Sequence, residues 1–240
     1  MNEPRKRNQT RTALVVPEYL PAADFVVAAL RSDEVLLADT FRYGRQSSQN
    51  RCRVRTPDGW QWLTVPVVGG QHGRSIRATR VDLSRAPLGR HWKSIVFNYQ
   101  STPYFEHYEH EVRGLFEHVY ESLGELTVQS SRVLCRLLGA SATMTTISAV
   151  EPGIVGWLSP EIAQYAPGLI VLDRQAPELD GGPPSIRVAG LAIEYRQNFP
   201  GFVAGLSALD ILFNLGPEAR SVLENNSQSR IAEPRRVWQK

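Results

Sequence analysis

The first forty residues alternate between short apolar runs and one segment with helical spacing. The run TRTALVV at 10–16 predicts a buried strand, AADFVVAALRS at 22–32 predicts a short helix, and DEVLLAD at 33–39 predicts a second strand. A strand, a helix and a strand in so short a span indicate a βαβ unit with a parallel sheet. Pro17 and Pro21 fix a stiff polar elbow after the first strand. Ligands of open α/β sheets bind beyond the carboxyl ends of the strands, so this elbow is a candidate site.

A hairpin pattern follows the second strand. The segments CRVRTP at 52–57 and WQWLTVPV at 60–67 flank the turn dipeptide Asp58-Gly59, which predicts a β-hairpin. The alternating segment SIRATRVDL at 75–83 predicts a further strand.

From Leu88 onward the apolar period is mostly helical. The later helices are predicted at 89–102, 102–123, 127–139, 205–215 and 217–225, and the later strands at 143–150, 168–173 and 191–196. The fold class is therefore α/β, with a mixed, partly parallel, Rossmann-like sheet, an inserted β-hairpin region and a helical block. We expect a single domain over 11–225, a disordered basic N-terminus over 1–10 and a flexible polar tail over 226–240, with a loop at 174–185.

Composition narrows the class of protein. The chain has 240 residues, of which 42% are hydrophobic and 21% charged, as in an ordinary globular protein. No apolar run reaches the length of a membrane span, and the basic N-terminus lacks the apolar segment of a secretory signal. Cys52 and Cys135 are far apart and lack metal-ligand spacing, which favours reduced thiols in a cytoplasmic protein.

Charge matters where the arginines cluster. Five arginines fall within fourteen residues: Arg42, Arg45, Arg51, Arg53 and Arg55. The guanidinium group presents a planar fork that suits phosphates and carboxylates. Nucleic acid would use the same groups, but the net charge is only +3, so the cluster favours a small anionic molecule as partner over nucleic acid.

The strongest polar cluster begins where the second strand ends. Asp39 closes that strand, and the following loop and hairpin carry Arg42, Tyr43, Arg45, Gln49, Asn50, Arg51 and Arg53. A carboxylate beside several guanidinium groups and amides is typical of a site that recognises a polar anion. The alternative is a solvated approach to the hairpin.

Three further groups are each open to two interpretations. The segment 91–99 carries His91, Lys93, Asn98 and Tyr99, either as site residues or as exposed polar positions of a helix. The polar line of Ser207, Asp210 and Asn214 either reaches solvent or belongs to a pocket or a buried polar network. The stripe of His107, His110 and His118 is read as a solvated helix face, and no metal site is predicted.

Several of these segments together resemble the WbqC-like family of bacterial proteins. The resemblance runs from about residue 13 to 224 and is most specific in TPDGWQWLTVPV and GLSALDILFNLGPE. It implies an α/β protein of surface-polysaccharide or specialised-metabolite biosynthesis that acts on a small molecule. It does not identify the reaction or a cofactor. The family usually has His-Gln before the proline that matches Pro17, where this chain has Val15 and Val16.

Two hypotheses follow from the residues and the resemblance. In the first, the chain is a group-transfer enzyme acting on an activated anionic substrate. Glu18, Tyr19 and the arginine-rich loop then orient the substrate, Asp39 is the general base or an orienting group, and Lys93 or Arg51 holds developing negative charge. In the second, the chain is a non-catalytic binding or scaffold protein, because valine at position 15 cannot transfer a proton.

Overall fold

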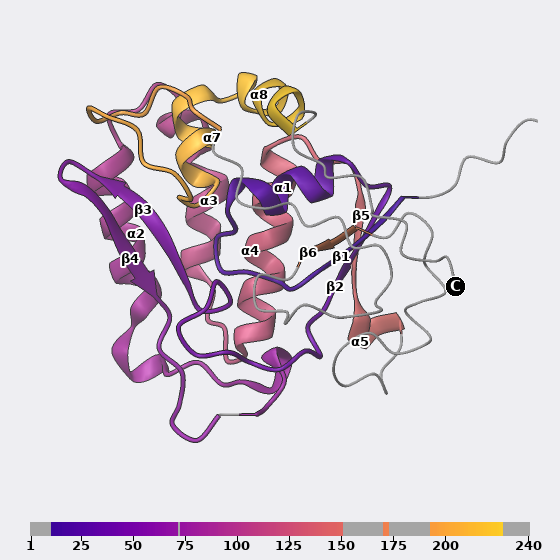
Figure 1. Cartoon of the computed structure of the whole chain (residues 1–240). Coiled ribbons are helices and arrows are strands. Elements are labelled where there is room, and N and C mark those ends of the chain that lie inside the picture. The colour runs from indigo at the N-terminus through magenta and orange to yellow at the C-terminus, as the bar shows by residue number, and fades with distance from the viewer. Residues whose placement is uncertain (1–10, 72, 151–169, 173–192, 228–240) are drawn as a thin grey trace, which may run out of the picture.

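The computed structural model describes residues 11–71, 73–150, 170–172 and 193–227 (Figure 1). Within these residues, the main sheet has four parallel strands in the order β5-β2-β1-β6. They are β1 (Thr12–Val15), β2 (Glu34–Leu37), β5 (Thr143–Thr146) and β6 (Ile170–Leu172). Helix α1 (Ala23–Leu30) connects β1 to β2, so the predicted βαβ unit and the α/β fold class are confirmed.

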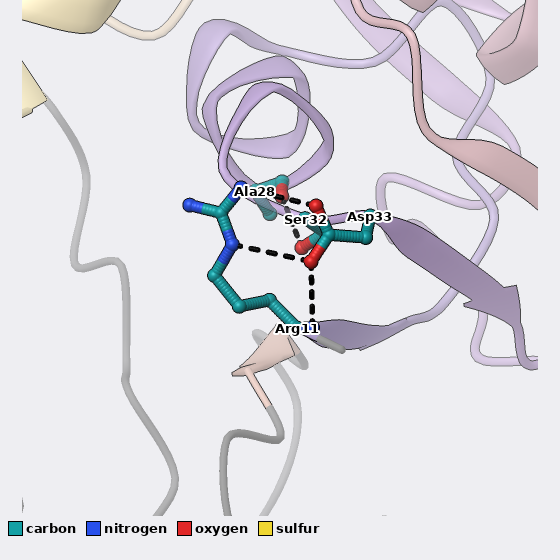
Figure 2. Close-up of polar contacts among 4 residues, drawn as sticks. All are labelled: Arg11, Ala28, Ser32 and Asp33. Carbon is teal, nitrogen blue, oxygen red and sulfur yellow. Dashed lines mark hydrogen bonds and ion pairs between the residues drawn. The ribbon is translucent and has the colours of Figure 1, made fainter. Parts of the chain in front are cut away.

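A charged pair ties the start of β1 to the turn before β2. The Arg11 backbone N–H and Nε both donate to Oδ2 of Asp33, at 2.8 and 3.3 Å, and Nη2 donates to Oδ1 at 3.1 Å (Figure 2). The Ser32 hydroxyl donates to the Ala28 carbonyl at 2.7 Å and satisfies one of the last carbonyls of α1. Both strands of the unit therefore enter the sheet in a fixed register.

The hairpin lies beside the helical block, away from the main sheet (Figure 1). Strands β3 (Arg51–Thr56) and β4 (Gly59–Thr64) pair antiparallel across the predicted turn. Gly59 has φ +134°, a conformation that favours glycine. Arg55 on β3 is only 2% exposed, and its guanidinium donates to backbone carbonyls of the turn and of the segment at 200–201, which fixes the hairpin against the C-terminal part of the chain.

The helices form a block that covers one side of the sheet and backs the hairpin (Figure 1). They are α2 (Pro87–Tyr99), α3 (Phe105–Glu117), α4 (Leu123–Leu137), α7 (Leu209–Leu215) and α8 (Glu218–Ser227), with the short α5 (Ile147–Val150) after β5. Helix α1 packs on α4 and α8, while α2 and α7 contact β3. The fold thereby brings the end of β1, the hairpin and the start of α7 together.

Two strand predictions are wrong in the described part of the chain. The segment at 75–83 contains the 3-10 turns η1 (Ile76–Ala78) and η2 (Leu83–Arg85), and it pairs only through isolated bridges. Residues 193–197 form no strand, although Ile193 and Gln197 are buried and Glu194 and Arg196 are exposed. The segment at 193–197 alternates in burial without a hydrogen-bonded ladder, and the segment at 75–83 buries Ile76, Thr79 and Val81 without a regular period of two, so the sequence pattern was misleading in both.

The helix predicted over 102–123 is two elements. Helix α3 ends at Glu117, and the Ser122 hydroxyl accepts from the Gly124 and Glu125 N–H groups at 3.1 and 3.4 Å to start α4. A serine followed three residues later by glutamate is a helix-start signal, and this one precedes an apolar run. The strand predicted over 143–150 ends at Thr146 and continues as α5. The loop predicted at 174–185, the terminal segment predicted at 1–10 and residues 228–240 of the tail predicted at 226–240 lie outside the described residues. The first two residues of that predicted tail belong to α8 instead, which ends at Ser227.

Candidate functional site

A cavity of about 230 Å³ lies where the elbow after β1 meets the hairpin. We call it the elbow cavity. Its wall combines the elbow, the loop at 46–48, strands β3 and β4, and the turn before α7. The residues are Glu18, Tyr19, Leu20, Ala22, Gln46, Ser48, Arg51, Cys52, Arg53, Trp62, Gly205 and Ser207. Two segments predicted to share a site, the elbow and the arginine-rich stretch, therefore do meet.

Two guanidinium groups and an aromatic surface dominate one side of this cavity. The Arg51 guanidinium carbon lies 4.0 Å from the ring centroid of Trp62, which is a cation–π contact. The Arg53 guanidinium carbon lies 5.1 Å from the Trp60 centroid, and its Nε donates to the Gly205 carbonyl at 3.1 Å. In the described part of the chain, neither arginine forms an ion pair. Two positive charges are thus held in place at the cavity by rings and a carbonyl rather than by carboxylates.

The elbow itself is held by two buried hydroxyls of α4. Ser130 and Ser131 donate to the Glu18 carbonyl at 3.0 and 3.2 Å, and they accept from the N–H groups of Leu20 and Glu18 at 3.3 and 3.4 Å. These bonds support a backbone that would otherwise be costly, because Leu20 has φ +45°. Gln46, on the facing loop, has φ +55°. Two non-glycine residues in the left-handed region both line this one cavity, which is how binding sites store strain.

Glu18 places a carboxylate in the same wall. The residue lines the cavity and is only 4% exposed, and its charge acts on Cys52, which lines the same cavity. Burial, with the negative charge of Glu18 added to it, raises the pKa of Cys52 and keeps its thiol protonated at neutral pH. Cys52 is therefore an inert wall residue, since the thiolate is the nucleophilic form.

Tyr19 and His91 form a buried polar pair behind the elbow. The Tyr19 hydroxyl lies 2.8 Å from Nδ1 of His91. Burial lowers the pKa of His91 to about 4, against the opposing effect of the Thr64 carbonyl, so the ring is neutral at pH 7. A neutral ring that donates to Thr64 has Nδ1 left to accept the tyrosine proton. Burial also raises the pKa of Tyr19. The pair therefore fixes the elbow to α2 and β4 without carrying charge.

A second buried network anchors α7. Tyr195 donates its hydroxyl proton to Oδ2 of Asp210 at 2.6 Å, and the Tyr99 hydroxyl accepts from the Arg55 N–H at 2.8 Å. Burial raises the pKa of Asp210 to about 6, while the hydroxyls of Tyr195 and Tyr99 and the charge of Arg55 act in the opposite direction. Of the two interpretations of the polar line of Ser207, Asp210 and Asn214, the structure therefore supports a buried polar network and not a solvent-exposed face. Ser207, Asp210 and Asn214 are 2%, 0% and 8% exposed.

The residues predicted as catalytic lie outside the elbow cavity. Oδ1 of Asp39 accepts from the Ser148 N–H at 3.0 Å, and the Ser148 hydroxyl also donates to the carboxylate, so Asp39 connects β2 to α5. The reason is topological, because β5 is the neighbour of β2 on the side away from β1. Lys93 is exposed on α2. The catalytic roles of both residues stay predictions, and the contacts of Asp39 are those of a structural group.

Several of the other residues predicted to bind a ligand instead form hydrogen bonds within the protein, either in the loop before the hairpin or in a helix. Gln49 accepts from the Gly44 N–H at 2.8 Å and donates to the Arg42 carbonyl at 3.3 Å, and Asn50 donates to the Val65 carbonyl at 3.0 Å. They shape the loop that leads into the hairpin. Outside the wall of the elbow cavity lie Arg42, Tyr43, Arg45, Gln49, Asn50, His91, Asn98, Tyr99 and Asp210. Arg42 and Arg45 are exposed, and the Asn98 amide donates to Ser94 within α2 at 2.8 Å.

Sequence reasoning missed three contributors to this site. Ser130 and Ser131 looked like ordinary polar positions of an amphipathic helix, and only their burial at 0% exposure marks them. Gly205 has φ +69°, and a Cβ there would overlap with Nη2 of Arg53. The alternation of Arg51 and Arg53 with Trp60 and Trp62 across a predicted hairpin was a readable signal, since paired strands bring such side chains onto one face.

Two other sequence expectations can be compared with the structure. The histidine stripe is solvent-exposed, as predicted for a solvated helix face: His107, His110 and His118 are all exposed. Within the described residues, no helix is both long and apolar enough to cross a membrane.

Comparisons with known proteins give a family and one distant relative. The model of the WbqC-like protein family matches residues 17–155, which is more than half of the chain and includes the elbow, the hairpin and α4. An uncharacterised protein of Mycobacterium tuberculosis, Rv1507c, is 28% identical over 230 residues, which cover 89% of this chain and 97% of the relative. No solved structure matches the chain at a significant level.

Proposed function

Because the chain belongs to the WbqC-like protein family, we propose that it binds a small anionic substrate in the elbow cavity, as a group-transfer enzyme or accessory protein of bacterial surface-polysaccharide or specialised-metabolite biosynthesis. One observation carries the proposal. Arg51 and Arg53 are held at the cavity by tryptophan rings and a backbone carbonyl, and no described acidic group forms an ion pair with either.

Arginine is well suited to this task. Its fixed fork binds phosphate or carboxylate oxygens through two parallel hydrogen bonds, and its charge persists at every physiological pH. The tryptophans that stack on these side chains restrict their rotamers, so less entropy is lost when the anion binds. Trp60 and Trp62 are each 43% exposed, which leaves ring surface available for an apolar face of the substrate.

Glu18 is the acid–base group of this proposal, in place of Asp39. Glu18 lines the elbow cavity beside Arg51 and Arg53, whereas Asp39 lies outside it, next to Ser148. In a transfer step, the acceptor's O–H or N–H would give its proton to Glu18 while the acceptor oxygen or nitrogen forms a bond to the transferred group. The bond to the anionic leaving group would break with its electron pair moving to that group, beside Arg51 and Arg53.

The alternative function is a binding protein that performs no reaction. Val15 and Val16 stand where the family usually has His-Gln, and they are 1% and 9% exposed. Apolar, buried side chains at the entrance to the elbow supply no proton donor or acceptor. A purified chain that binds its anion but leaves it unchanged, with an acceptor present, would favour this alternative.

A thermal-shift screen against nucleotide sugars, acyl phosphates and amino acids tests the proposal. A ligand at 100 times its Kd stabilises the folded state by about 2.7 kcal/mol. We expect an anionic compound to raise the Tm of the native chain and of Arg113→Gln, whose target arginine lies exposed on α3. The same compound should leave the Tm of Arg51→Gln and Arg53→Gln nearly unchanged. Equal shifts in all four proteins would contradict the proposal.

A further inference from the structure

A second cavity, of about 280 Å³, adjoins the elbow cavity across Arg53. We call it the apolar cavity. The two share four wall residues: Ala22, Arg53, Gly205 and Ser207. We propose that the apolar cavity binds an alkyl or acyl chain of the molecule whose anionic group contacts Arg51 and Arg53, so that the substrate is an amphiphilic anion. This inference rests on the proposed function and specifies its substrate class.

The lining of the apolar cavity suits a hydrocarbon chain. Ile193, Leu206 and Ile211 are 4%, 4% and 1% exposed and form its inner wall. Phe202 and Val203 are half-buried and also line it, so apolar surface is still available to a ligand there. A volume of about 280 Å³ is near the lower end of the range for small-molecule pockets, which favours a short chain.

Tyr195 and Asp24 in this wall form hydrogen bonds within the protein, whereas the guanidinium of Arg53 at its border uses only Nε in such a bond among the described residues. The Tyr195 hydroxyl donates to Asp210 at 2.6 Å, and Oδ1 of Asp24 accepts from the Phe25 N–H at 2.9 Å. Nε of Arg53 donates to Gly205, and this bond holds the guanidinium at the boundary between the two cavities. The combined site therefore has a cationic end and an apolar end, which matches a chain with an anionic head.

Calorimetric titration with methyl, butyl, hexyl and octyl phosphate tests the inference. Burial of each added methylene should tighten binding about threefold to fourfold until the cavity is filled. Butanoate, hexanoate and octanoate form the second arm, which distinguishes a carboxylate head from a phosphate head. Stronger binding of longer chains in either arm supports the inference, and the arm that binds identifies the head group.

Substitutions in the wall of the apolar cavity test whether the alkyl chain of the ligand binds there. Val203→Trp should fill the apolar cavity, abolish the gain with chain length and leave the affinity for methyl phosphate unchanged. Ala204→Phe, at an exposed position of the same wall, provides a second filling variant if the first fails to fold. Val68→Trp is the matched control, because Val68 is 40% exposed and lines neither cavity.

Failure of the proposed apolar site can be distinguished from failure of the proposed anion-binding function. Equal affinity for methyl and octyl phosphate, both lost in Arg53→Gln, would overturn the apolar site while the anion site stands. An unchanged chain-length gain in both filling variants would also overturn it. Octanol that binds as tightly as octyl phosphate would show that the two cavities do not act on one molecule. Absence of binding by every phosphate and every carboxylate would contradict the proposed function itself.

Discussion

Nε of Arg53 donates to the carbonyl oxygen of Gly205 at 3.1 Å, and this bond joins the hairpin to the turn before α7. Gly205→Ala should break this hydrogen bond, because the new Cβ would overlap with Nη2 of Arg53. It should also strain the backbone, because Gly205 has φ +69°. Gly201→Ala is the matched control, since Gly201 has φ +76° but open space around its Cβ position. Both variants should lose about 1–2 kcal/mol of unfolding free energy from backbone strain.

Only Gly205→Ala should also weaken anion binding, by an expected tenfold or more. Urea unfolding and calorimetric titration of both variants separate the two effects. The role assigned to the Arg53–Gly205 bond is wrong if both variants bind the anion equally well.

The hydroxyl of Ser130 supports the elbow. Ser130→Ala leaves the buried Leu20 N–H without its acceptor and removes a donor to the Glu18 carbonyl, so the chain should lose about 1–3 kcal/mol of unfolding free energy. Ser101→Ala, at an exposed serine, should change it by less than about 0.5 kcal/mol. Urea denaturation measures both values. Equal effects of the two substitutions would show that the elbow does not depend on this hydroxyl.

His91 should make the folded state sensitive to mild acid. Its pKa is lowered from 6.5 to about 4 by burial, so the contribution of its neutral form is complete above pH 6.5 and is lost as the pH falls towards 4. The size of this change is about 3 kcal/mol. His91→Gln keeps an acceptor for Tyr19 without titrating, so the stability advantage of the native chain over this variant should decline over that range.

His107→Gln on the exposed face of α3 is the control, and it should track the native chain. Unfolding free energies at half-unit pH steps from 4 to 7 provide the comparison. A constant difference between the native chain and His91→Gln would show that the imidazole is not buried in its neutral form.

Asp210 should affect the unfolding free energy in the direction opposite to His91, so that the folded state loses stability as the pH rises. Burial raises its pKa from 3.8 to about 6, so the folded state prefers the protonated acid and is progressively penalised as the pH rises from 3.8 to 6. Asp210→Asn removes this titration, and its unfolding free energy relative to the native chain should rise by about 3 kcal/mol across that interval.

Asp58→Asn, in the exposed hairpin turn, is the matched control for Asp210→Asn. A relative stability of Asp210→Asn that falls, or stays level, between pH 4 and 6 would contradict the burial assigned to the carboxylate. Because the slopes for His91 and Asp210 are opposite, the two contributions partly offset each other in the native chain, and each variant is needed to expose one of them.

The fold was predictable where local pattern and pairing agree. The strand–helix–strand order at 12–37 and the Asp58-Gly59 turn each specify their own neighbours, so both were recognised. In the segment at 75–83 and in the described part, 193–196, of the strand predicted at 191–196, buried residues such as Ile76 and Ile193 are interspersed with exposed ones, yet no ladder forms. Periodicity records that burial but contains no information on whether a ladder partner exists.

The site was predictable only in part for a similar reason. The elbow and the paired arginines could be read from strand ends and hairpin register, and both line the cavity. Asp39 also stands at a strand end, but strand order decides which neighbour it meets, and β5 lies beside β2. That order depends on pairing between residues more than a hundred positions apart, which local sequence does not encode.

The central claim is that Arg51 and Arg53 hold an anion, and titration of inorganic pyrophosphate into the double variant Arg51→Gln/Arg53→Gln tests it most directly. We predict that the native chain and the Arg113→Gln control bind with the same Kd, and that the double variant binds at least tenfold more weakly. Higher salt should weaken native binding, because the contact is between charges at an open cavity. Equal Kd values for the native chain and the double variant, or no pyrophosphate binding by the native chain, would contradict the claim.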